Sequence, residues 1–85
     1  MINKPSLPGP VRFERATEHG VRYYEIRVQP DLFGMVVIRV WGRRGSRLGR
    51  MITTPCVSDE QAESIYNRCV RQRMRRKYQQ TPVPH

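Results

Sequence analysis

The sequence is poor in the residues from which most catalytic and metal sites are built. Its 85 residues include two histidines, His19 and His85, and two cysteines, Cys56 and Cys69. The cysteine spacing fits neither a disulfide framework nor a zinc site, and no Ser or Cys has a His partner that would make it a nucleophile. We therefore expect no enzyme activity, no metal ion, no cofactor and no small-molecule substrate, with both cysteines reduced and buried.

Long apolar runs are missing as well. The longest, residues 35–38, is far too short to cross a membrane, and the first residues lack the apolar core of a signal peptide. The sequence therefore predicts a cytoplasmic protein with no membrane partner.

Acidic residues are absent from two stretches in which arginine is concentrated. The formal net charge is +9, and most of the 16 basic residues are Arg. No acid occurs between Asp31 and Asp59 or after Glu63. The first stretch holds Arg39, Arg43, Arg44, Arg47 and Arg50, and the second holds Arg68, Arg71, Arg73, Arg75, Arg76 and Lys77. Such clusters indicate a protein that binds a polyanion, although a solvated basic surface without a function is the alternative.

The distribution of proline predicts one domain, residues 11–78, between disordered tails at residues 1–10 and 79–85. Alternating polar and apolar residues predict strands at 11–17 and 22–29, and β-branched residues predict others at 35–41 and 50–57. In the third strand Val36, Ile38 and Val40 are predicted to face the core. Trp41 would then lie with Arg39 on the less buried face, unless it is an ordinary core residue.

A helix is predicted from Asp59 to Lys77, with Ser58 as its N-cap and Gln61 completing a capping box. Its buried stripe is predicted to comprise Ala62, Ile65, Tyr66 and Cys69, flanked by Val70 and Met74. Arg68, Arg71 and Arg75 form a basic stripe on the opposite side. The expected fold class is α+β: a four-stranded antiparallel meander sheet with one C-terminal helix packed on one face.

The third strand ends in Trp41-Gly42-Arg43-Arg44-Gly45. A Trp offers a flat stacking surface, arginines supply forked donors that suit phosphate, and glycines let the backbone turn sharply. This combination predicts nucleic-acid binding through Trp41 and the arginines around it. The predicted site comprises Trp41, Gly42, Arg39, Arg43, Arg44, Arg47 and Arg50. Because the helix is expected to cover the Val36 face, its basic stripe would point away from Trp41 and be a secondary contact.

Three segments together resemble the WGR domain family: residues 23–26, the Trp-Gly-Arg run, and the helix from Ser58 to Tyr78. The resemblance covers nearly all of residues 11–78 and implies a small sheet with one helix. It also implies contact with DNA, near ends or breaks in the poly(ADP-ribose) polymerases that carry this domain. There the motif Trp packs on a DNA sugar, a role that would fall to Trp41, and the motif Arg, here Arg43, joins the domain to DNA or to neighbouring domains.

The chain departs from the family pattern in three places. Its loop between Gly45 and Gly49 is one residue longer than usual, and Arg50 stands where Gln is frequent. Lys77 replaces a Gly that often ends the helix, so the usual left-handed stop is missing. No polymerase domain accompanies the motif, and the resemblance therefore implies binding alone. DNA is the expected partner, and docking of an acidic protein through the same surface is the alternative.

Overall fold

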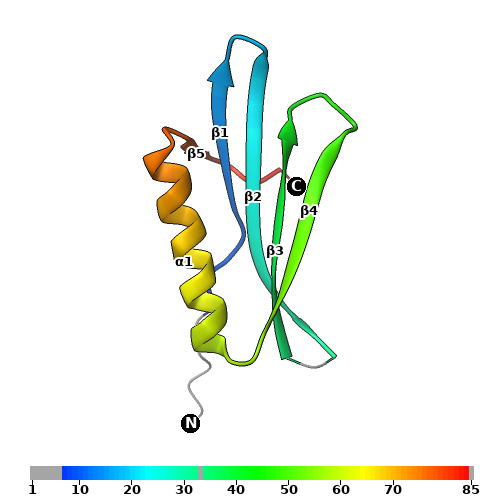
Figure 1. Ribbon diagram of the computed structural model, residues 1–85, viewed down its shortest axis with the longest axis vertical. Helices are drawn as coiled ribbons and strands as arrows, with labels where there is room; N and C mark the ends of the chain where they lie inside the picture. The colour runs from blue at the N-terminus through cyan, green and yellow to red at the C-terminus, as the bar shows by residue number, and fades with distance from the viewer. Residues whose placement is uncertain (1–6, 33, 85) are drawn as a thin grey trace.

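The computed structural model describes residues 7–32 and 34–84. Five antiparallel strands form one sheet in the order β4-β3-β2-β1-β5, and one helix lies against it (Figure 1). The elements are β1 (Val11–Thr17), β2 (Gly20–Asp31), β3 (Gly34–Arg43), β4 (Gly49–Cys56), α1 (Asp59–Arg75) and β5 (Gln79–Thr81). The predicted α+β class and the four-stranded meander are confirmed, and a fifth strand is added.

The fifth strand lies in the segment predicted to be a C-terminal tail. Gln79–Thr81 pair with β1, so that Phe13 is opposite Gln80. Tail prediction from proline content could not detect this pairing, because it depends on the direction in which the chain leaves the helix. Residues 1–6 of the predicted N-terminal tail, and His85, lie outside the described residues. The carbonyl of Gly9 accepts a hydrogen bond from the Tyr66 hydroxyl at 3.0 Å.

The helix begins as predicted and ends two residues earlier than predicted. The Ser58 hydroxyl accepts a hydrogen bond from the Gln61 N–H at 3.1 Å, while the Gln61 side chain accepts one from the Val57 N–H. At the other end Lys77 adopts a left-handed conformation, with φ of 69°. The N–H groups of Lys77 and Tyr78 donate to the carbonyls of Met74 and Arg73, which is the Schellman pattern. The expectation that the left-handed stop is missing is therefore wrong, because Lys77 itself adopts the conformation that Gly often supplies at this position.

The hydrophobic core lies between α1 and one face of the sheet. From the sheet it contains Val11, Phe13, Tyr24, Ile26, Val37 and Cys56, and from α1 it contains Ala62 and Cys69. Both cysteines are free and buried, as predicted. Met74, predicted to flank the buried stripe, is exposed, and Arg73 is buried instead. No helix within the described residues is long and apolar enough to cross a membrane.

The predicted core face of β3 is wrong. In the register of the sheet Val28 lies opposite Val37, and Tyr24 lies opposite Trp41. Paired residues project from the same face, so the odd-numbered residues of β3 share the helix-covered face with Tyr24 and Ile26. Apolar side chains occur on both faces of β3, and its own alternation could not decide between them. Only the pairing with β2 determines that Trp41 lies on the helix side of the sheet.

Candidate nucleic-acid interface

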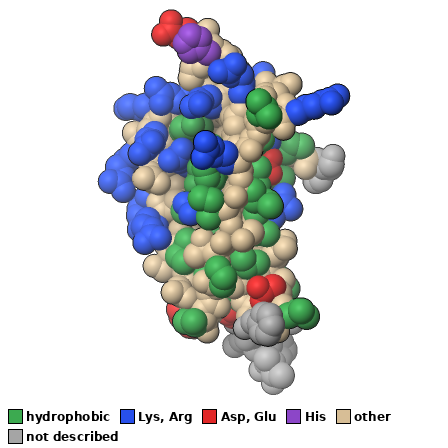
Figure 2. Space-filling model, turned by 45° about the vertical axis from the view of Figure 1, so that its right-hand side comes forward, with side chains coloured by type: hydrophobic (Ala, Val, Ile, Leu, Met, Phe, Trp, Pro, Cys, Tyr) green, Lys and Arg blue, Asp and Glu red, His purple; other side chains and the backbone are tan. Residues whose placement is uncertain are grey.

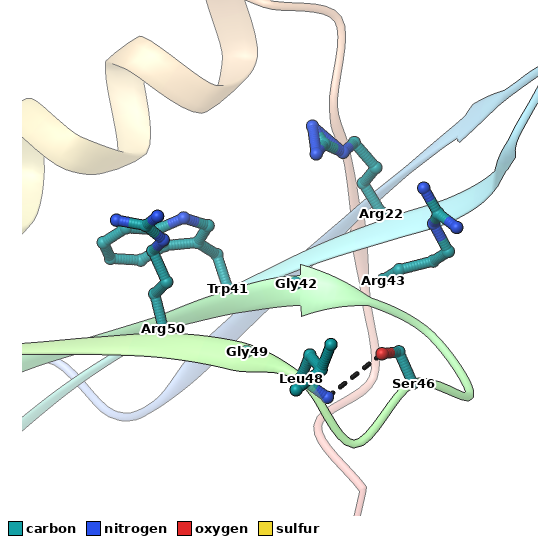
Figure 3. A pocket seen from close by; sticks show the side chains of 8 residues that line it. All are labelled: Arg22, Trp41, Gly42, Arg43, Ser46, Leu48, Gly49 and Arg50. Atoms are coloured by element: carbon teal, nitrogen blue, oxygen red, sulfur yellow. Dashed lines mark hydrogen bonds between the residues drawn. The ribbon is translucent and has the colours of Figure 1, made fainter.

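Trp41 lies beside three arginines near the end of the sheet where β3 turns into β4. It is opposite Tyr24 on β2 and opposite Arg50 on β4. In the next row toward the hairpin tip, Arg22 pairs with Arg43. Figure 3 shows that Trp41, Arg22, Arg43 and Arg50 all rise from the same side of the sheet, the side on which the helix lies.

These side chains line a shallow pocket of about 360 Å³. Its other lining residues are Ser46, Leu48 and the backbone of Gly42 and Gly49. Trp41 is half-buried, and its ring stacks on Tyr24 with the ring centroids 5.6 Å apart and the planes at 15°. The indole is thus held by the core and still forms part of the pocket wall. From the sequence, Trp41 is expected to be either a residue of the less buried face or an ordinary core residue. In the structure it has features of both.

Gly42 has a packing reason that the sequence did not reveal. A Cβ at Gly42 would lie 3.1 Å from the Leu48 carbonyl oxygen and 3.3 Å from the Tyr23 hydroxyl. Gly49, which pairs with Gly42, would bring a Cβ within 3.1 Å of the same hydroxyl. Both glycines let Tyr23 lie across the base of the β3–β4 loop. They therefore maintain the shape of the loop that borders the pocket.

Four ion pairs lie on the other face of the sheet. Arg12 binds Glu14 at 3.0 Å and also Glu25, while Arg27 lies 3.5 Å from Glu25. Arg12 is buried and lies over the Tyr23 ring at 4.6 Å. Burial alone would lower the pKa of Arg12, but its hydrogen bonds to the two carboxylates, and their charge, raise it. This face therefore has its positive charge largely neutralised.

Arg44 belongs to that neutralised face, which corrects its predicted place beside Trp41. The Arg44 guanidinium binds Glu14 at 3.0 Å, and the Arg44 backbone N–H donates to the Val21 carbonyl at 2.7 Å. Trp41 and Arg44 are three positions apart and therefore on opposite faces of a strand continued from β3. The prediction from the sequence placed them together because they are close along the chain. It did not take into account that side chains alternate between the two faces of a strand.

The other predicted arginines have different surroundings. Arg43 and Arg50 border the pocket, and neither forms an ion pair in the described part of the chain. Arg39 lies on the same face in the row below Trp41, where it is half-buried and its Nε has no hydrogen-bond partner. Arg47 is exposed in the loop. The structure therefore groups Arg39, Arg43 and Arg50 with Trp41, and Arg44 is excluded from the group.

Sequence reasoning missed Arg22. Its residue type is not informative by itself, because it stands at the start of a strand with a mixed face. The signal that could have found it is the register: a hairpin closed by the pair Asp31 and Gly34 puts Arg22 opposite Arg43. Arg15 extends the same row, since it pairs with Arg22.

The basic stripe of the helix, Arg68, Arg71 and Arg75, is exposed as predicted. Its relation to Trp41 differs from the prediction, because α1 packs on the face that carries Trp41. The end of the helix and the tips of the β1–β2 and β3–β4 hairpins point the same way (Figure 1). Figure 2 shows Lys and Arg side chains gathered over the upper half of the molecule, with few acidic ones among them. Within the described residues, no group of His, Cys, Asp and Glu could hold a metal ion.

Comparison with known proteins places this fold and its motif in a family. Residues 11–83 match the family described as WGR domain. The chain is similar to a protein of Sinorhizobium fredii described as "Uncharacterized protein y4dW", with 34% identity over 62 residues, and this match covers 72% of the chain and 30% of that relative. No solved structure matches the chain. The chain belongs to the WGR domain family.

Proposed function

We propose that this chain is a non-catalytic DNA-binding module that contacts the sugar-phosphate backbone through Trp41 and the arginines beside it. The family supports nucleic-acid binding in general terms. The observation that supports this particular surface is the separation of charge between the two faces of the sheet. Carboxylates pair with Arg12, Arg27 and Arg44 on one face. On the other face Arg22, Arg43 and Arg50 lie around the indole, and none of them pairs with a carboxylate of the described residues.

Unpaired guanidiniums around an aromatic ring suit a nucleic-acid backbone. Arginine forms paired hydrogen bonds with phosphate oxygens, and an indole stacks on a sugar or a base. The pocket is shallow, and α1 lies over the core instead of projecting from the sheet. The proposed mode is therefore contact with backbone and sugar, with little reading of base sequence.

Binding can be measured by fluorescence anisotropy of labelled short duplexes, nicked duplexes and single strands over a series of salt concentrations. We expect a steep fall of the affinity with salt, because each neutralised phosphate adds about 0.9 to the log–log slope. Trp41→Phe keeps an aromatic ring on Tyr24 but reduces the stacking surface, and it should weaken binding severalfold. Comparing the three DNA forms would reveal a preference for ends or breaks.

The control is Arg27→Ala, which removes one positive charge from the opposite face. Arg27 is partly exposed and pairs with Glu25. If Arg27→Ala weakens binding as much as Arg43→Ala does, net charge alone determines binding and the proposed surface is wrong. If wild-type protein shows no salt-dependent binding to any of the three forms, the DNA-binding proposal itself fails. Docking of an acidic protein would then be the remaining use of this surface.

A further inference from the structure

Four side chains link the pocket to the end of the helix through ring contacts. Trp41 stacks on Tyr24, and the guanidinium carbon of Arg73 lies 4.2 Å from the centre of the Tyr24 ring. The same carbon lies 5.0 Å from the centre of the Tyr78 ring. The path from Trp41 to Tyr78 therefore runs from the sheet through the last turn of α1 to the residue that precedes β5.

Arg73 is much less exposed than the arginines that border the pocket. It is only 8% exposed, and its Nε is buried without a hydrogen-bond partner. None of the ion pairs in the described residues includes it. A buried guanidinium without such partners is costly, and its visible compensation is the two aromatic rings that it contacts. The structure therefore keeps a mostly buried cation in contact with two aromatic rings.

We propose that Arg73 is a positioning residue, which fixes the plane of Tyr24 and thereby the orientation of Trp41 at the pocket. The guanidinium is planar and lies against Tyr24, so it restricts the tilt of the ring on which the indole stacks. Tyr78, the second ring that Arg73 contacts, is itself fixed in position by backbone hydrogen bonds. Its N–H donates to the Arg73 carbonyl at 3.1 Å, and the following residues pair with β1 as β5.

The role of Arg73 in DNA binding rests on the function proposed above, whereas its effect on Trp41 can be measured without DNA. Trp41 is the only Trp in the chain, so its fluorescence reports on this site alone. Acrylamide quenching should increase in Arg73→Met, because a freed Tyr24 ring no longer covers the indole. Arg71→Met is the matched control, since Arg71 is exposed on the same helix, and its quenching should equal that of the wild type.

DNA titration of the same variants separates positioning from direct contact. Arg73→Met should lower the affinity for a short duplex about three- to tenfold at every salt concentration, since part of the stacking contribution is lost. The log–log salt slope should stay within about 0.3 of the wild-type value, because no phosphate contact is removed. Arg73→Lys keeps the charge but not the planar group, so its affinity for the duplex should lie between those of the wild type and Arg73→Met.

Three results would overturn the proposal. The first is a folded Arg73→Met protein with wild-type quenching. The second is a decrease of the salt slope by about one, which would make Arg73 a direct phosphate contact. The third, should Arg73→Met fail to fold, is a folded Arg73→Lys protein with wild-type quenching and affinity. If the wild type binds no DNA, the function proposed above fails, and the quenching of free protein still decides whether Arg73 orients Trp41.

Discussion

Arg44 and Arg50 provide the sharpest test of the assigned surface. Both lie in or next to the β3–β4 loop, and the sequence alone assigns both to phosphate binding. In the structure Arg50 is opposite Trp41 and lines the pocket, whereas Arg44 binds Glu14 on the other face. We predict that Arg50→Ala removes one phosphate contact and that Arg44→Ala removes none.

The magnitude follows from counterion release. One phosphate contact contributes about 0.9 to the slope of log affinity against log salt concentration. A fourfold change in salt, from about 50 to about 200 mM, should therefore change the ratio of wild-type to Arg50→Ala affinity about 3.5-fold. The same ratio for Arg44→Ala should remain nearly constant, since that guanidinium is already paired with Glu14.

The assay is fluorescence anisotropy of a labelled short duplex at four or more salt concentrations, with thermal unfolding as a check on folding. Each variant loses one positive charge, so their net charges are equal. The assignment would be refuted if the salt slope of Arg50→Ala equalled that of the wild type, or if the slope decreased equally in both variants. An equal decrease in both variants would mean that binding depends on net charge and not on the face to which the charge belongs.

Three further predictions concern the elements that hold the site, and thermal unfolding measures each. Lys77→Gly should raise the free energy of unfolding by about 0.5–1 kcal/mol, because the left-handed conformation is unfavourable for Lys and is adopted freely by Gly. An unchanged unfolding midpoint would contradict this. Gly42→Ala should lower it by about 1–3 kcal/mol, since the new Cβ would press on the Leu48 carbonyl at 3.1 Å; wild-type stability would show that the loop moves easily. Ser58→Ala should lower it by about 1 kcal/mol through loss of the cap to Gln61, and a neutral result would show that the cap does not contribute.

Local patterns predicted most of the fold. The strand at Val11–Thr17 was predicted to the residue, and the start of α1 followed from Ser58 and the acidic first turn. These features depend on side chains a few positions apart. The fifth strand was missed because Gln79–Thr81 contain no strand pattern, and they pair with β1 only because the turn at Lys77 directs the chain there.

The candidate site was predictable in part. The Trp-Gly-Arg motif located the pocket, and Arg43 and Arg50 were found with it. Which face of β3 carries the core could not be determined from the strand alone, because apolar side chains occur on both of its faces. That choice changes the neighbours of Trp41 and removes Arg44 from its surroundings. Arg22 and Arg73 come from other elements. Strand register places Arg22 opposite Arg43, and the end of the helix places Arg73 against Tyr24.

The most direct test of the central claim is the fluorescence of Trp41 during titration of the protein with a short duplex. A sugar or base that stacks on the indole should quench or shift its emission, with a midpoint that rises steeply as salt is added. The account predicts that this change saturates together with the anisotropy of labelled DNA. Saturating anisotropy with no change in Trp41 emission would contradict it, because the DNA would then be bound away from the indole.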